Sequence, residues 1–488
     1  MMKQLKLSAV AMALALAGCA HMAPDQNPLA KRDAANVQLS SDIKLAREGW
    51  PEAQWWTAYH DEQLDALIKQ ALSSNPSLDK AAAQIGRALS GVQRSAAELG
   101  MGTDLSASAN RQRYSGTGLF PAPIGGAYFS EETVRLEARY NFDWWGKNKA
   151  QIAAAVGQVN AGRASYAQAE QALSSAIAQS YFRLQGSWSR SANLAQMIEA
   201  QNALVQDKAR RISHGLANAD EQRAAETELQ LMLKQQAQFN ADVRREREAL
   251  RALLGVDGSA ATADPDALVK GLQPRAMQPA PHALPERLGL ELLARRPDLQ
   301  AARWRVQTAL SQIDVAKAAF YPDVNLSGSI GLDSISYENL LTSPSRTIFL
   351  GPTLTMPLFD SQRLNAELAN ARSNRNEIIA DYNLAVIQAA RDVAQDAVQL
   401  QGIEQQIARQ QEASASAAAQ LHSAQSRLQA GLADNGSVLN ARLALLRQQD
   451  ASLSLQQMQL LAEVALTNAL GGGYRDMGTP PPVAASSK

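Results

Sequence analysis

The sequence predicts a mainly helical protein that also carries four β-strands and is built from two copies of one plan. Three observations support this fold class. Long stretches without proline are rich in Ala, Gln, Arg, Glu and Leu, short segments alternate apolar with polar residues, and many positions recur at one offset. At 488 residues the chain is too long for one ordinary globular core, so several domains or an elongated shape are expected.

The repeat divides the chain. NPSL at 75–78 is echoed 221 residues later by RPDL at 296–299, and Gly215-Leu216-Ala217 is echoed 216 residues later by Gly431-Leu432-Ala433. The predicted organisation is a leader at 1–18, an N-terminal segment at 19–74, repeat 1 at 75–255, a proline-rich linker at 256–290, repeat 2 at 291–471 and a tail with the composition of disorder at 472–488. Within the repeats, hairpins are expected at about 103–142 and 323–358, and long helices at 146–214, 218–255, 361–430 and 436–470.

The strands have two chemically different faces. In TVRLEARYNF (133–142) one face holds Val134, Leu136, Ala138, Tyr140 and Phe142, while the other holds Arg135, Glu137, Arg139 and Asn141. Strands of about ten residues have the length of tilted bilayer-crossing strands. The pattern predicts an apolar face toward lipid and Arg135, Glu137 and Arg139 toward a watery lumen. A soluble amphipathic hairpin packed on helices is the alternative.

Helices are not expected to cross the membrane, because no run of about 18 apolar residues follows the leader. A membrane-spanning part would therefore be a β-barrel. Four strands cannot close a barrel, since the smallest known membrane barrels use about eight. Several chains would have to pool their strands, and the sequence alone allows two chains with eight strands.

The N-terminus predicts a secreted, lipid-anchored protein. Lys3 and Lys6 precede an apolar stretch at 7–17, and Leu16-Ala17-Gly18-Cys19 resembles the lipobox of bacterial lipoproteins. That resemblance implies cleavage before Cys19, the single cysteine of the chain, followed by its acylation. An ordinary secretory signal with an incidental cysteine is the alternative.

Residues for catalysis or for a cofactor are not evident. The five histidines lie far apart, and no nucleophile, acid–base pair or phosphate-binding loop occurs in a recognisable motif. We therefore expect no enzyme, no metal and no cofactor other than the covalent lipid. With 47 basic and 47 acidic residues, the chain gives no reason to expect nucleic acid as a partner.

The repeated helix–hairpin–long-helix plan behind a lipobox resembles the TolC/OprM/NodT family of outer-membrane efflux channels. The resemblance rests on LLARRPDL at 292–299, AKAAFYP at 316–322, LFD at 358–360 and LGGGY at 470–474, and it covers nearly all of the mature chain. It implies a homotrimer with a twelve-stranded outer-membrane barrel and a helical periplasmic tunnel. It also implies a passive duct that docks with a periplasmic adaptor and an inner-membrane pump. The segments at 49–56 and 331–335 look most like the branch of multidrug efflux lipoproteins.

The resemblance also assigns candidate functional residues. Gly215-Leu216 and Gly431-Leu432, one pair in each tip turn, would contact the adaptor, although glycine also simply terminates helices. The family usually narrows the tunnel with a ring of aspartates. This chain has Asn440 at that place, Gly436 where a bulky apolar residue often stands, and Asp434 as a partial replacement for the charge.

Two other functions share parts of this pattern. The same fold serves protein (type I) secretion, for which the channel would be an exit duct of another kind. A lipid-anchored coiled-coil scaffold that opens no pore is the second alternative. The alternating hairpins speak against a scaffold, which has no need of strands that are polar on one face and apolar on the other.

Overall fold

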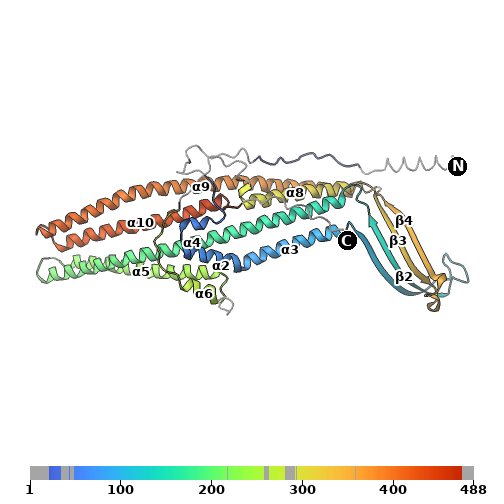
Figure 1. Ribbon diagram of the computed structural model, residues 1–488, viewed down its shortest axis with the longest axis horizontal. Helices are drawn as coiled ribbons and strands as arrows, with labels where there is room; N and C mark the ends of the chain where they lie inside the picture. The colour runs from blue at the N-terminus through green and yellow to red at the C-terminus, as the bar shows by residue number, and fades with distance from the viewer. Residues whose placement is uncertain are drawn as a thin grey trace. The chain divides into compact units, whose positions relative to one another are not determined.

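The computed structural model describes residues 21–33, 43, 49–216, 218–257, 263–280, 292, 294–357 and 359–474 (Figure 1). The described chain forms two compact units. The strand unit comprises residues up to 31, 84–162 and 302–382, and the hairpin unit comprises 32–83, 163–301 and 383 onward. The predicted leader, Cys19, Ala217, Leu358 and the predicted tail from residue 475 lie outside the described residues.

The strand unit contains one antiparallel sheet in the order β1-β2-β3-β4. Its strands are β1 (Met101–Arg113), β2 (Tyr128–Asn141), β3 (Asp323–Ser334) and β4 (Arg346–Thr355). The register places Leu105, Leu136, Ile330 and Ile348 in one row across all four strands. Because side chains alternate between faces, the rows two residues away share that apolar face, as the alternation in the sequence predicts.

Each of the two β-hairpins, β1–β2 and β3–β4, is followed by a long helix. α4 (Lys147–Ser213) begins after β2, and the Asp143 carboxylate accepts hydrogen bonds at 2.9 Å from the backbone N–H groups of Asn148 and Lys149. This caps the free amides of the first turn. α9 (Ser361–Gln429) follows β4, and α3 (Pro76–Ala97) and α8 (Pro297–Ala318) precede β1 and β3.

Residues 21–33 form an N-terminal strap along α9. The Ala23 and Leu29 amides donate to the side chains of Asn365 (2.8 Å) and Asn376 (3.1 Å). Asp25 pairs with Arg375 at 2.6 Å, and Met22 packs against a small core of Ile313, Phe320, Leu364 and Leu368. Amide and guanidinium groups of α9 thus satisfy the backbone of an extended segment that has no sheet partner.

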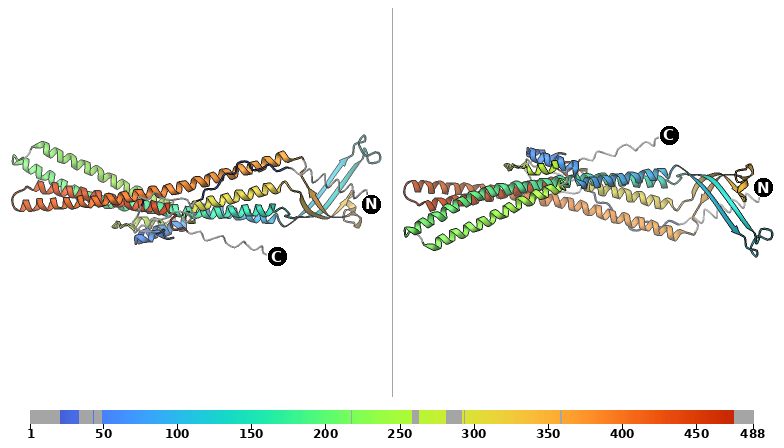
Figure 2. Two further views of the ribbon diagram at one scale, coloured as in Figure 1. Left: turned by 90° about the horizontal axis from the view of Figure 1, so that it is seen from above. Right: turned by 90° about the horizontal axis from the view of Figure 1, so that it is seen from below.

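The hairpin unit contains two antiparallel helix pairs (Figure 2). α4 runs beside α5 (Ala219–Leu253), and α9 runs beside α10 (Asn435–Ala469). Arg190 of α4 makes two hydrogen bonds to Asp450 of α10, at 3.0 and 2.9 Å, and the Asn193 amide donates to the Leu446 carbonyl. Polar contacts therefore join the α4–α5 helix pair to the α9–α10 helix pair.

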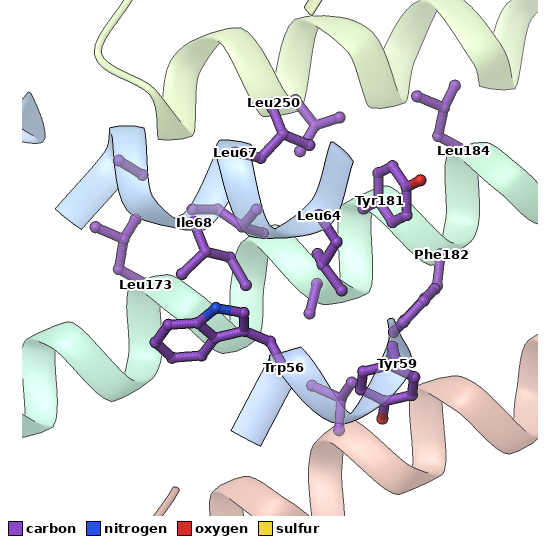
Figure 3. Close-up of a cluster of buried hydrophobic side chains, with 14 of the residues drawn as sticks. Trp56, Tyr59, Leu64, Leu67, Ile68, Leu173, Tyr181, Phe182, Leu184 and Leu250 are labelled. Atoms are coloured by element: carbon purple, nitrogen blue, oxygen red, sulfur yellow. The ribbon is translucent and has the colours of Figure 1, made fainter. Parts of the chain in front are cut away.

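The main core of this unit lies where α2 (Glu62–Ser74) packs between α4 and α5 (Figure 3). Leu64, Leu67 and Ile68 are fully buried and lie against Leu250 and aromatic side chains of α4. Burying such side chains contributes roughly 1.5–3 kcal/mol each. Part of the predicted linker also joins this core, because α6 (Ala263–Lys270) forms there and Val269 is buried.

The described chain ends at Tyr474, three residues into the segment at 472–488 whose composition predicts disorder. Gly471, Gly472 and Gly473 all have positive φ angles, and a Cβ on Gly473 would lie 1.9 Å from the Glu52 carbonyl oxygen. Glycine is needed here because other residues could neither adopt this backbone nor fit. The glycines at 471–473 therefore lie where the backbone packs closely against other parts of the chain. Within the described parts of the chain, no helix combines the length and apolarity needed to cross a bilayer.

Candidate functional site

The polar face of the sheet carries the predicted lumen residues. Glu137 lies between two arginines of the same strand and pairs with Arg139 at 2.7 Å and with Arg135 at 3.8 Å. All three side chains are at least partly exposed, so each pair contributes little to stability. Asp104 and Ser329 lie in the same row across the sheet as Glu137. Phe349 completes this row and is an apolar exception on the polar face.

The opposite face exposes large apolar side chains. Leu105 is 73% exposed, Ile330 55% and Ile348 78%, and these residues belong to one continuous row. A contiguous apolar patch of this kind on a folded chain marks a surface that contacts lipid or another protein. Both outer strands, β1 and β4, also leave one edge of their backbone without a strand partner within the sheet.

The two tip turns, one between α4 and α5 and the other between α9 and α10, have the same geometry. Gly215 and Gly431 have φ angles of 70° and 71°, and each following leucine donates its amide to the carbonyl five residues earlier, at 2.8 Å. This is the Schellman ending of a helix, in which the residue after glycine usually packs back on the helix. Here Leu216 is 68% exposed and Leu432 is 78% exposed. Each tip therefore presents a leucine to its surroundings.

Asp434 links the two tips of one chain. Its carboxylate caps α10 by accepting from the Ser437 amide at 2.8 Å, and it forms an ion pair with Arg211 near the end of α4. The hydrogen bonds from Ser437 are the main cause, and the Arg211 contact a further one, of a pKa near 2 for Asp434. The carboxylate therefore stays ionised at every physiological pH.

Gly436 and Asn440 lie on α10 but differ in their surroundings. Gly436 is buried, and a Cβ at this position would lie 3.4 Å from the Asp207 carboxylate of α4. Asn440 is exposed one turn further on. Gly436 therefore packs against α4, where a methyl group would make only an ordinary contact, whereas the Asn440 side chain is free to face other molecules.

Two neighbouring carboxylates lie on α9, away from the tip turns. Asp392 and Asp396 are one turn apart on α9, and the Arg296 guanidinium lies 3.9 Å from Asp392. Burial, followed by the charge of Asp392, raises the pKa of Asp396 to about 6. Among the described residues, no group of His, Cys, Asp and Glu side chains could hold a metal ion.

The comparisons with known proteins decide the family. The model of the outer membrane efflux protein family matches residues 67–256 and 288–472. The chain belongs to this family. It is similar to the multidrug resistance outer membrane protein MdtP of Shigella flexneri, with 34% identity over 475 residues and 94% of each chain covered. It is 36% identical over 471 residues to MdtQ of Escherichia coli O6:H1, covering 95% of this chain and 96% of MdtQ.

Solved structures agree with this assignment. The crystal structure of the outer membrane protein VceC from Vibrio cholerae superposes with a TM-score of 0.76 at 31% identity, covering 87% of this chain and all of VceC. This outer membrane efflux protein is therefore a channel protein of the outer membrane and not an enzyme.

Sequence reasoning missed two residues at the tips of this efflux protein. Arg211 and Asp207 stand at the end of α4 and contact α10, more than 220 residues further along the chain. An Asp and an Arg one helical turn apart beside a tip glycine are the local signal. Their partners follow only from the packing of the two hairpins.

Proposed function

We propose that this protein is the passive exit duct of a tripartite efflux system and that it exports drugs or other small toxic molecules. Three chains would form one twelve-stranded barrel that continues into a helical tunnel in the periplasm. The observation that carries this proposal is the sheet, which is apolar on one face, polar on the other and open at both edges.

Edge-to-edge assembly follows from the strand directions. The four strands alternate in direction, so β4 of one chain and β1 of the next can pair antiparallel like every other pair. Closing the ring satisfies the backbone groups that an open edge would leave unpaired in lipid. Two copies would give eight strands and three would give twelve. The resemblance to trimeric family members favours three.

The tips are the proposed docking surface for the adaptor. Leu216 and Leu432 are exposed at equivalent turns, although most Schellman leucines would pack on their own helix. Large apolar side chains exposed on a folded surface mark a place that contacts another protein. Cys19, two residues before the first residue of the strap, would carry the lipid anchor on the same molecule.

The tip constriction would have little net charge. Asn440 is neutral, and the Asp434 carboxylate is engaged by Ser437 and Arg211. A ring of three free carboxylates attracts cations, whereas three amides do not. We therefore expect a closed state with weak cation selectivity.

Small molecules are the favoured cargo, because MdtP and MdtQ are named multidrug resistance proteins. Protein secretion through the same fold is the second candidate. A non-conducting scaffold is disfavoured because its strands would have no reason to separate apolar from charged side chains.

Single-channel recording tests the duct. Purified full-length protein in a planar bilayer should give discrete openings of one size, and Asn440→Asp should make the current more cation-selective. Light scattering of the same sample should give the mass of three chains. An oligomer that inserts but never conducts would support the scaffold, and a two-chain mass would reject the twelve-stranded barrel.

Docking needs a separate test. Binding of a periplasmic adaptor protein from the same bacterium, measured by surface plasmon resonance, should weaken at least tenfold in Leu216→Ser/Leu432→Ser. Leu231→Ser is the matched control, because Leu231 is also an exposed leucine (54%) but lies within α5. Equal losses in both variants would argue against the tips as the docking surface.

A further inference from the structure

The apolar face of the sheet changes character at its loop end, where it carries arginines. Arg111 and Arg113 are the last residues of β1 on this face, and Arg346 is the first residue of β4. The register assigns them to the apolar face, because Arg113 lies opposite Tyr128 and Arg346 lies opposite Leu332. These charges therefore belong to the face that we propose contacts lipid.

Arg111 and Arg113 lie beyond the apolar band, and Arg346 lies in its last row, opposite Leu332. This band runs from Phe142, the residue after β2, to Val134 within it. At about 3.3 Å per residue this is roughly 26 Å along the strand and about 20 Å of depth at a 40° tilt. Arg111 and Arg113 lie four and six residues beyond the last row of this band, the row of Val134 and Ala107, so they lie about 10 and 15 Å above it. A hydrocarbon band of about 25 Å would end about 5 Å above that row, which puts the two arginines about 5 and 10 Å outside its edge. This is the depth of lipid headgroups.

The local contacts leave the guanidinium groups available. Arg111 and Arg113 both lie over the Tyr128 ring, at 5.6 and 6.0 Å from its centroid, and the Arg113 Nε donates to the Gly126 carbonyl at 3.2 Å. Within the described residues, neither arginine forms an ion pair with a carboxylate. Glu132 is the acidic residue on this part of the face, in the row of Ala109.

We propose that Arg111, Arg113 and Arg346 bind the phosphate groups of phosphorylated lipids in the outer leaflet of the outer membrane. This inference rests on the proposed function, which places this face in lipid and the hairpin loops outside the cell. Guanidinium groups bind phosphate in a two-pronged geometry, and the tyrosine ring provides a platform at the membrane interface.

Closure of the barrel would bring the three arginines together. β1 and β4 are the two edges of the sheet, and Arg346 lies at the same end of the strands as Arg111 and Arg113. Where β4 of one chain meets β1 of the next, both edges would contribute arginines to one subunit junction. Arg346 lies a few residues deeper, and its long side chain can extend toward the headgroups.

Lipid binding by the detergent-purified full-length protein tests this site. Native mass spectrometry would compare lipid A with two phosphates against chemically dephosphorylated lipid A with the same acyl chains. The wild type should bind the phosphorylated form preferentially. Each arginine near a charged membrane surface contributes about fivefold, so Arg111→Gln/Arg113→Gln/Arg346→Gln should weaken binding roughly 100-fold.

Two controls separate charge from folding. Lysine at the same three positions keeps the charge but loses the two-pronged geometry, so it should bind more tightly than the glutamine variant and less tightly than the wild type. Arg135→Gln/Arg139→Gln on the opposite face should bind like the wild type. Equal binding of both lipids, or full binding by the triple glutamine variant, overturns the proposal.

The same preparations distinguish this inference from the proposed function. Conductance in a bilayer of uncharged phosphatidylcholine needs the barrel but no anionic lipid. A triple glutamine variant that conducts but has lost lipid A binding supports both proposals. A conducting wild type that does not discriminate between the lipids rejects only the lipid site, and a wild type that neither assembles nor conducts rejects the duct.

Discussion

Removing the charge of Asp434 should loosen the link between the two tips. The pKa of about 2, against an ordinary value of 3.8, corresponds to about 2.4 kcal/mol at about 1.4 kcal/mol per factor of ten. The Asp434 side chain is 46% exposed, so solvent screening reduces this to about 1 kcal/mol. Asp434→Asn keeps an N-cap and loses the charge, so it should cost about that amount.

The first tip supplies a matched control. Asn218 caps α5 as Asp434 caps α10, but with a neutral amide that accepts from the Glu221 amide at 3.0 Å. Asn218→Ala removes a cap alone and should cost about 1 kcal/mol. Asp434→Ala removes a cap and a charge and should cost about 2 kcal/mol.

Hydrogen exchange followed by mass spectrometry measures the effect locally. Amides at 428–440 should exchange about fivefold faster in Asp434→Asn than in the wild type, while the core of the hairpin unit should be unchanged. Arg211→Gln should have a smaller effect in the same direction, because the Arg211 contact lowers the pKa of Asp434 less than the Ser437 hydrogen bonds do. The double variant should be no worse than Asp434→Asn alone. Wild-type exchange in Asp434→Asn, or additive effects in the double variant, would refute the link.

The acidity of Asp434 also fixes the pH dependence of the link. A carboxyl group with a lowered pKa contributes stability that is complete above its unfolded value of 3.8 and is lost as the pH falls through about 2. Tip protection should therefore be constant between pH 5 and 8.

Three further changes test other parts of the structure. Asp396 has a pKa raised to about 6, so the free energy of unfolding should increase as the pH falls from about 7 to 4. Asp396→Asn should increase it at pH 8 by about 1 kcal/mol, after allowance for solvent screening, as measured by urea titration. Gly473→Ala should cost 3 kcal/mol or more in the same assay, because its Cβ would collide with backbone, whereas Gly402→Ala, in open space within α9, should add about 0.5–1 kcal/mol. Leu64→Ala, at a fully buried position of α2, should lower stability by about 2–5 kcal/mol, and a smaller loss would show that the core around α2 collapses to fill the space.

The elements that the sequence predicts well have local causes. A period of two in TVRLEARYNF depends only on neighbouring residues, and it anticipates both faces of the sheet that the register shows. The arginines of β1 follow the same alternation, because Arg111 and Arg113 continue the series of every second residue that contains Leu105 and Ala107.

Other features depend on contacts between distant residues. Asp434 meets Arg211 across 223 positions, and the strap meets α9 across more than 340. The short helix α6 forms in a segment whose prolines suggest a linker, because Val269 and Leu272 are buried in a core made by other helices. No local pattern encodes these contacts.

The N-terminal strap has a consequence for the position of a lipid on Cys19. From Ala23 to Leu29 the chain advances six residues, about 19 Å if extended at 3.1 Å per residue, while α9 advances eleven residues from Asn365 to Asn376, about 17 Å. The strap is therefore nearly taut. The Asn365 amide also donates to the His21 carbonyl at 2.8 Å, so the strap is held on α9 from its first residue. A lipid on Cys19 would then enter the bilayer close to the start of α9, and lengthening the chain between Cys19 and His21 would free the anchor without changing the fold.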